Sequence, residues 1–152
     1  MSYIPAALCP FIEIDQEAWS GELRRLSIMF VNLKIDLSLA KTQEGLIKIQ
    51  KVIETVQKCV YYHQGSLNKL LMDDKGSTLI VVFGLPPLSH QDDPIRAILS
   101  GFALIKELAV INCKCSIGIA TGTVYAGVIG TSGSRREYSV LGDSVNLSAR
   151  LM

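Results

Sequence analysis

Two strand-like runs joined by a short turn constrain the fold more than any other feature of this sequence. The runs occupy residues 66–72 and 77–83, and the segment between them, residues 73–76, reads Asp-Asp-Lys-Gly. Asp and Gly tolerate the backbone angles of tight turns, so the segment predicts an antiparallel β-hairpin. A nearly continuous apolar run at residues 26–33 predicts another strand, buried on both faces in the interior of a sheet.

Two amphipathic helices are expected on either side of the hairpin. Before it, apolar residues recur at spacings of three and four, which places them on one face of a helix that ends near Gly65. These residues are Leu46, Ile49, Ile53, Val56 and Val60. After the hairpin, Asp93 is expected to cap a second helix with Pro94 at its first position. The residues expected on the buried face of this helix are Ile95, Ile98, Leu99, Phe102, Ile105 and Leu108.

The remaining elements complete an α+β arrangement. Polar and apolar residues alternate at 113–119, which predicts a strand, and glycines interrupt the stretch that follows it. A strand at 135–141 and a closing helix give the order β-α-β-β-α-β-β-α. This order is compatible with a ferredoxin-like fold, in which helices cover one face of an antiparallel sheet. We expect a lead-in segment at residues 1–23 and one domain at residues 24–152.

Composition excludes several classes of protein. Hydrophobic residues make up 49% of the chain and charged residues 19%, which argues against disorder. The net charge of +1 gives no electrostatic footprint for nucleic acid or an anionic membrane. No apolar run is long enough to span a bilayer, and no basic region marks a signal peptide. The four cysteines have spacings that fit neither a zinc site nor a disulfide framework, which predicts reduced thiols in a cytoplasmic protein.

The most informative segment for function is residues 142–150, Gly-Asp-Ser-Val-Asn-Leu-Ser-Ala-Arg, directly after a strand. Asn146 and Arg150 are four positions apart and therefore share one face of a helix. A separate apolar stripe is formed by Val145, Ala149 and Met152. Taken alone, the segment predicts a plain amphipathic helix with Asp143 or Ser144 as its N-cap.

Together with the segments before it, this motif resembles the catalytic domain of the class III nucleotidyl cyclases, which make cyclic AMP and cyclic GMP. Several short motifs agree in order over about residues 24–152, and this agreement is more specific than any single motif. The motifs lie at residues 30–33, 68–69, 76–78, 116–122 and 127–130. The chain is most similar to the second cyclase domain of the soluble, bicarbonate-responsive adenylyl cyclases, through its Phe-Val-Asn-Leu, Asp-Lys-Gly and Arg-x-Glu-Tyr sequences.

The resemblance assigns roles to four residues. Arg150 corresponds to the arginine that stabilises charge on the reacting phosphate, a task that suits an always-charged guanidinium. Asn146 corresponds to the residue that orients the ribose. Lys69 and Ser139 correspond to the base-reading pair, and these residue types imply adenine, because lysine can donate to its N1 and a hydroxyl can face its exocyclic amine. Considered singly, Lys69 is better explained as a solvated strand lysine and Ser139 as a neutral strand residue; it is their combination with Asn146 and Arg150 that favours base recognition.

The metal half of the implied site is incomplete. Class III cyclases hold two Mg²⁺ or Mn²⁺ ions with two carboxylates. The first carboxylate position falls at Asn32, which is neutral and a poor ligand for a hard cation. The second falls at Asp73 when counted forward from Lys69, or at Ser77 when counted back from the end of the hairpin. We prefer Ser77, because it sits at a strand start and the surplus residues then fit the turn.

The resemblance therefore implies the nucleotide-binding half of an adenylyl cyclase. Such cyclases are head-to-tail dimers with active sites at the interface, so the metal ions would come from a complementary domain with two aspartates. Acting with that partner, the chain would convert ATP to cyclic AMP and pyrophosphate, and it would be inactive alone. Bicarbonate would act only on the paired domains. The resemblance also implies that the domain is incomplete at its C-terminal end.

Two other functions compete with this one. The first is a catalytically silent cyclase-homology module used for dimerisation or scaffolding. The second is an unrelated ferredoxin-like module that binds RNA, and it ranks last because the strands lack stacking aromatic residues and the surface is not basic.

Overall fold

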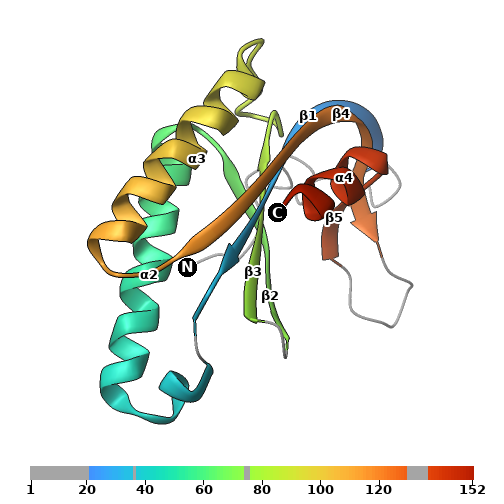
Figure 1. The fold of residues 1–152 in the computed structure, drawn as a ribbon. Coiled ribbons are helices and arrows are strands. Elements are labelled where there is room, and N and C mark those ends of the chain that lie inside the picture. Colours follow the sequence, from blue (N-terminus) through green and yellow to red (C-terminus); the bar gives the residue numbers. More distant parts are fainter. Residues whose placement is uncertain (1–20, 36, 74–75, 130–136) are drawn as a thin grey trace.

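The computed structural model describes residues 21–35, 37–73, 76–129 and 137–152. Its framework is a five-stranded antiparallel sheet with the strand order β2-β3-β1-β4-β5 (Figure 1). In chain order the elements are β1 (Glu22–Leu33), the 3₁₀ helix η3 (Leu37–Lys41), α2 (Gln43–Tyr62), β2 (Ser66–Asp73), β3 (Gly76–Phe83), α3 (Asp93–Val110), β4 (Cys115–Ile129), β5 (Glu137–Leu141) and α4 (Asp143–Leu151). The predicted element order and the α+β class are confirmed.

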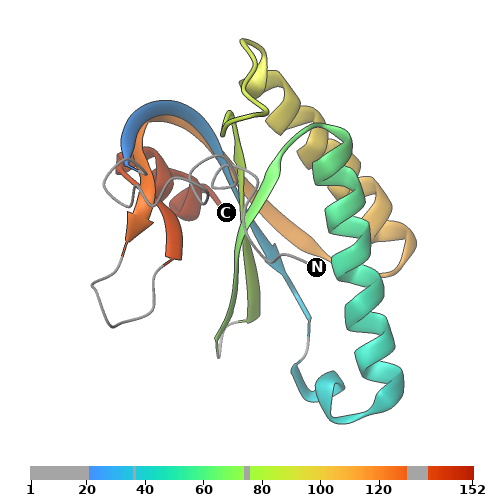
Figure 2. The ribbon, with the colours of Figure 1, turned by 180° about the vertical axis from the view of Figure 1, so that it is seen from behind.

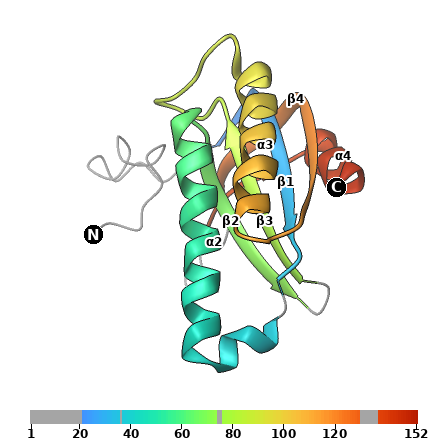
Figure 3. The same cartoon turned by 60° about the vertical axis from the view of Figure 1, so that its left-hand side comes forward.

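The sheet separates two apolar layers. Helices α2 and α3 lie side by side over one face (Figure 3), and α4 lies against the other face (Figure 1). The central strand β1 serves both layers, because successive side chains point to opposite faces of a strand. Met29, Val31 and Leu33 belong to the α2/α3 layer, whereas Ile28 and Phe30 belong to the α4 layer. This double burial explains the continuous apolar run at 26–33, and it confirms the predicted interior strand.

Helix α3 presents a different face to the core from the one predicted. Five of the residues predicted to be buried are 48–68% exposed, and these are Ile95, Ile98, Leu99, Phe102 and Ile105. The buried residues are instead Asp93, Ala97, Ser100, Gly101, Leu104 and Leu108. Of the predicted set only Leu108 is therefore correct. The residues that face the sheet at Ser100 and Gly101 are small, and a Cβ atom at Gly101 would make an ordinary contact with Ile119 Cδ1 at 3.4 Å.

Helix α2 agrees with its prediction in part. Val56 and Val60 are buried as expected, but Leu46 is exposed. The helix begins after Thr42, whose hydroxyl oxygen accepts the Gly45 N–H at 3.1 Å and so caps the first turn. Among the helices in the described ranges, none combines the length and apolarity needed to cross a membrane.

The starts of the other two helices differ by one residue from the sequence prediction. The N-cap of α3 is Asp92 rather than Asp93. The carboxylate of Asp93 instead accepts the backbone N–H of His90 at 2.8 Å and holds the preceding loop. The N-cap of α4 is Gly142, and neither Asp143 nor Ser144 takes that position.

The predicted hairpin is confirmed, and Asp73 pairs with Gly76 at its end. Strand β4 is longer than predicted, because it continues through the glycines of its sequence from Cys115 to Ile129. It pairs with the whole of β1, and these two long strands of the sheet curve together into an arch (Figures 1 and 2). This arch carries β5 and α4 back toward the second face of the sheet.

Candidate functional site

The four residues predicted to contact nucleotide come from three elements. Lys69 lies on β2, Ser139 on β5, and both Asn146 and Arg150 on α4. Lys69 pairs with Ile80 of β3, a member of the α4 layer. Directly paired residues share a face of the sheet, so Lys69 lies on the α4 side.

Strands β2 and β5 touch although they stand at opposite edges of the sheet. The Asn68 side-chain amide donates to the Tyr138 carbonyl at 3.1 Å. Beside this bond, Lys69 Nζ lies 3.0 Å from Glu137 Oε2, and both side chains are partly exposed. The arch of β1 and β4 is what brings these strands together, since 70 residues separate Asn68 from Tyr138 along the chain.

Ser139 lies on the face of β5 that points away from the α4 layer, as Glu137 does. Tyr138 and Val140 belong to or pack against the α4 layer, and Glu137 reaches Lys69. The one-residue alternation of a strand gives Ser139 the same direction as Glu137. Ser139 is 6% exposed and pairs across the sheet with Gly127. The structure thus brings the strands of the two predicted base-reading residues together, and Glu137 links Lys69 to β5.

Asn68 and Glu137 are the residues of this region to which sequence reasoning gave no role. The Asn68 Oδ1 atom is buried and has no hydrogen-bond partner among the described residues. Burial chiefly raises the pKa of the neighbouring Tyr138 phenol, and the charge of Glu22 adds to this effect, so Tyr138 is a neutral group at physiological pH. Asn68 and Glu137 lie within the family motifs of the sequence, but their contacts could not be predicted, because these depend on the arch.

Helix α4 is held against β4 by two glycines. A Cβ atom at Gly118 would lie 2.1 Å from the Ser148 carbonyl oxygen, so the two backbones leave no room for a side chain. A Cβ atom at Gly122 would likewise meet the Ser144 hydroxyl. The predicted apolar stripe of α4 is confirmed, with Val145, Ala149 and Met152 packed against the α4 layer.

The outer surface of α4 carries the predicted catalytic pair. Asn146 and Arg150 are both exposed. Their placement four residues apart directs them to one side of a rigid helix, clear of the apolar contacts that hold it.

The predicted metal positions do not converge. Asn32 pairs with Thr78, whereas Ser77 pairs with Leu33, so Asn32 and Ser77 lie on opposite faces of the sheet. The Asn32 Oδ1 and Ser77 Oγ atoms are both buried, and neither has a hydrogen-bond partner among the described residues. These are neutral groups, and no cluster of three His, Cys, Asp or Glu residues occurs in the described ranges. The donor set at Asn32 and Ser77 therefore does not fit a Mg²⁺ or Mn²⁺ ion.

Comparisons with known proteins bear on this geometry. The family model for the adenylate and guanylate cyclase catalytic domain matches residues 20–152. The chain is 34% identical over 146 residues to human adenylate cyclase type 10, and the match covers 92% of this chain but only 9% of that protein. It is 31% identical over 145 residues to an uncharacterised protein of Mycobacterium tuberculosis, covering 91% of this chain and 24% of the relative.

Solved structures agree with the sequence matches. The guanylyl cyclase Cya2 superposes with a TM-score of 0.70 at 28% identity, covering 86% of this chain and 70% of that one. A bacterial light-regulated adenylyl cyclase gives a TM-score of 0.77 at 21% identity, covering 98% of this chain and 45% of the other, which is a likeness of fold alone. The resemblance drawn from the sequence motifs is confirmed, and the chain belongs to the adenylate and guanylate cyclase catalytic domain family.

Proposed function

We propose that this chain is the nucleotide-binding half of an adenylyl cyclase. Paired with a complementary cyclase domain, it presents ATP for conversion to cyclic AMP and pyrophosphate. The observation that supports the proposal is the contact between β2 and β5, which brings the strand that carries Lys69 against the strand that carries Ser139. The similarity to adenylate cyclase type 10 supports adenine rather than guanine chemistry.

Base recognition in this proposal rests on Lys69 and the groups around it. An ammonium has three N–H donors, and Glu137 occupies only one direction at 3.0 Å. Lys69 can therefore be oriented by Glu137 and still donate to adenine N1. The Ser139 hydroxyl and the unpartnered Asn68 Oδ1 are acceptors suited to the exocyclic amine of adenine.

The reaction needs positioning and charge stabilisation. The ribose 3′-oxygen attacks the α-phosphorus, a new O–P bond forms, the bond to pyrophosphate breaks, and the hydroxyl proton passes to water. Asn146 orients the ribose by hydrogen bonding. Arg150 stabilises the negative charge that develops on the phosphate oxygens, because a guanidinium forks onto two of them without losing its own charge.

The carboxylates for Mg²⁺ or Mn²⁺ are assigned to the partner domain. Bound there, the ions would activate the 3′-oxygen and neutralise the phosphates. The mismatch at Asn32 and Ser77 supports this division, since neither residue offers a charge to a hard cation.

The same mismatch favours one alternative, a silent domain that pairs with a catalytic partner and acts as a scaffold. Calorimetry on the paired domains separates the two functions. The proposed half-site requires ATP binding that involves Lys69, whereas the scaffold requires pairing without any contribution of this chain to nucleotide affinity.

The decisive experiment measures cyclic AMP production by this chain mixed with a cyclase domain that bears both metal-binding aspartates. We expect activity with Mg²⁺ or Mn²⁺ in the mixture and none from this chain alone. Arg150→Ala should lower turnover by about 100-fold or more, the range seen when one charge-stabilising donor is removed. Arg25→Ala, at an exposed arginine of β1, is the matched control and should leave turnover unchanged. Equal turnover of the wild type and Arg150→Ala would refute the assignment.

A further inference from the structure

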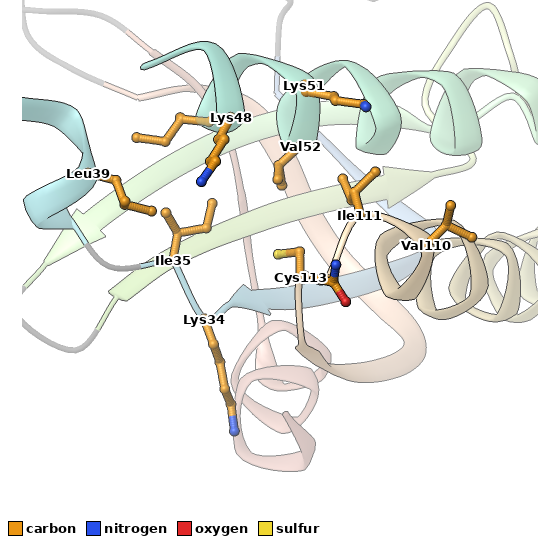
Figure 4. A pocket seen from close by; sticks show the side chains of 11 residues that line it. Lys34, Ile35, Leu39, Lys48, Lys51, Val52, Val110, Ile111 and Cys113 are labelled. Atoms are coloured by element: carbon orange, nitrogen blue, oxygen red, sulfur yellow. The ribbon is translucent and has the colours of Figure 1, made fainter. Parts of the chain in front are cut away.

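A pocket lies on the α2/α3 side of the sheet, opposite the side on which Lys69 lies. It has a volume of about 460 Å³, which is in the range of small-molecule sites. Its walls come from the segment after β1, the 3₁₀ helix η3, the first turns of α2 and the turn that follows α3 (Figure 4). None of these elements carries a residue assigned to nucleotide, metal or catalysis.

The floor of the pocket is apolar. Val52 is a member of the main core cluster, and Ile35 and Ile111 pack against that cluster from the pocket side. Leu39 of η3 closes one end and Cys113 lies at the base (Figure 4). Burial raises the pKa of the Cys113 thiol, so this sulfur is a neutral part of the lining rather than a nucleophile.

One ammonium enters this apolar space. Lys48 points from α2 into the gap above Ile35, whereas Lys34 points away from it (Figure 4). The lining contains no aspartate or glutamate. In the part of the chain that the structure describes, the Lys48 ammonium has neither an ion pair nor a hydrogen bond. A cation over an apolar floor, without a neighbouring carboxylate in the lining, attracts an anion.

The walls are held in place without any ligand. On one side, a Cβ atom at Gly45 would collide with the Leu39 carbonyl oxygen, so η3 sits directly against the start of α2. On the other side, the backbone N–H groups of Ile111 and Cys113 both donate to the Leu108 carbonyl, at 3.2 and 2.9 Å. A pocket with fixed walls does not have to be ordered when a ligand binds, which favours affinity.

We propose that this pocket binds a small organic anion with a compact apolar body, of the class of medium-chain carboxylates. Its charged head pairs with Lys48, and its hydrocarbon part lies on Ile35, Val52 and Ile111. This pocket is separate from the proposed nucleotide site, because the pocket lies on the α2/α3 side of the sheet and Lys69 lies on the α4 side.

The test titrates octanoate into the chain labelled at its isoleucine δ-methyl groups and follows their NMR signals. We expect saturable shifts at Ile35, Ile49 and Ile111. The exposed Ile98 and Ile105 of α3 serve as internal controls for nonspecific binding and should not shift. Shifts of equal size at the pocket and at α3, or no shifts at the pocket, would overturn the proposal.

Charge reversal supplies the second arm of the test. Lys48→Glu should weaken octanoate binding at least tenfold, and Lys48→Gln should weaken it less. Lys106→Glu, which changes an exposed lysine of α3 outside the pocket, should bind as the wild type does. Lys48 is itself exposed, so these variants should keep the fold, which the unshifted methyl signals will report. Octanol binding as tightly as octanoate, or octanoate binding equally well to Lys48→Glu, would refute the anion site.

Discussion

Replacing Gly118 by alanine tests how the helix that carries Asn146 and Arg150 is held in place. The added Cβ atom would lie 2.1 Å from the Ser148 carbonyl oxygen and 2.5 Å from the Met152 backbone nitrogen. Both obstacles are backbone atoms of the helix and its end, so no side chain can rotate away. Restoring an ordinary contact of 3.4 Å from 2.1 Å requires α4 to move by about 1.3 Å.

This displacement sets the magnitude of the expected effect. Overpacking of a filled interior destabilises a protein typically by 1–3 kcal/mol, and a clash between two backbones belongs at the upper end, so we expect about 3 kcal/mol. For a chain of 152 residues, that loss lowers the melting temperature by roughly 6–12 °C. A shift of about 1 Å in catalytic groups reduces rates by about 100-fold, so the activity of the paired domains should fall by a similar factor.

Urea unfolding followed by circular dichroism provides the measurement, and Gly101→Ala provides the matched control. Gly101 lies inside helix α3, and a Cβ atom there would make an ordinary contact of 3.4 Å with Ile119 of β4. Alanine is the better helix former there, so this variant should be stabilised by about 0.5–1 kcal/mol. A Gly118→Ala protein within about 0.5 kcal/mol of the wild type would refute the close docking of α4.

Three further predictions follow from burial and charge. On α3, Phe102→Ser should change the free energy of unfolding by less than about 0.5 kcal/mol, whereas Leu104→Ala should lower it by about 2–5 kcal/mol; the reverse order in urea unfolding would mean that α3 is rotated. Glu137→Gln should change stability by no more than about 1 kcal/mol but weaken ATP binding by the paired domains in calorimetry, because Lys69 loses its orienting partner; unchanged affinity would contradict that role. Burial raises the pKa of the Cys59 thiol, so the folded state keeps a proton that the unfolded chain releases. The stabilisation is present below the ordinary thiol pKa and is lost as pH rises through the raised value, and unfolding measured from pH 7.5 to 10 should show a smaller decline for Cys59→Ala.

The hairpin and the central strand could be predicted because local rules determine them. Residues 73–76 contain turn-forming types, and the run at 26–33 is apolar on both faces because both faces are buried. The buried face of α3 could not be predicted in the same way. This helix is apolar over most of its circumference, and the small residues Ser100 and Gly101 face the sheet because they fit beneath it.

The extent of β4 shows a second limit. Its glycines suggested breaks in the strand, but Gly118 and Gly122 continue the strand and leave the space that α4 fills. A sequence pattern cannot distinguish a glycine that ends a strand from one that admits a neighbouring helix, because the difference lies in an element that follows about 25 residues later.

The candidate site was reached through family motifs rather than through periodicity. Lys69, Ser139, Asn146 and Arg150 keep their roles as predictions, and the structure brings the strands of the first two together. Glu137 was missed because its contact with Lys69 depends on the curvature of two long strands. The predicted metal positions depend on the register of the hairpin, because a shift of one residue moves a side chain to the other face of the sheet. Ser77 pairs with Leu33 rather than with Asn32, so the two positions lie on opposite faces.

The arch of β1 and β4 has a consequence for the order in which the chain can fold during synthesis. Ser27 and Thr121, which share a side-chain hydrogen bond at 2.8 Å in this arch, are 94 residues apart. The ribosome adds about 5–20 residues per second, so β1 spends several seconds without β4. During that interval β1 can pair with β3, and β3 with β2, beneath the two long helices. We therefore expect β1, β2 and β3 to form their part of the sheet first, and β4, β5 and α4 to join it when they emerge.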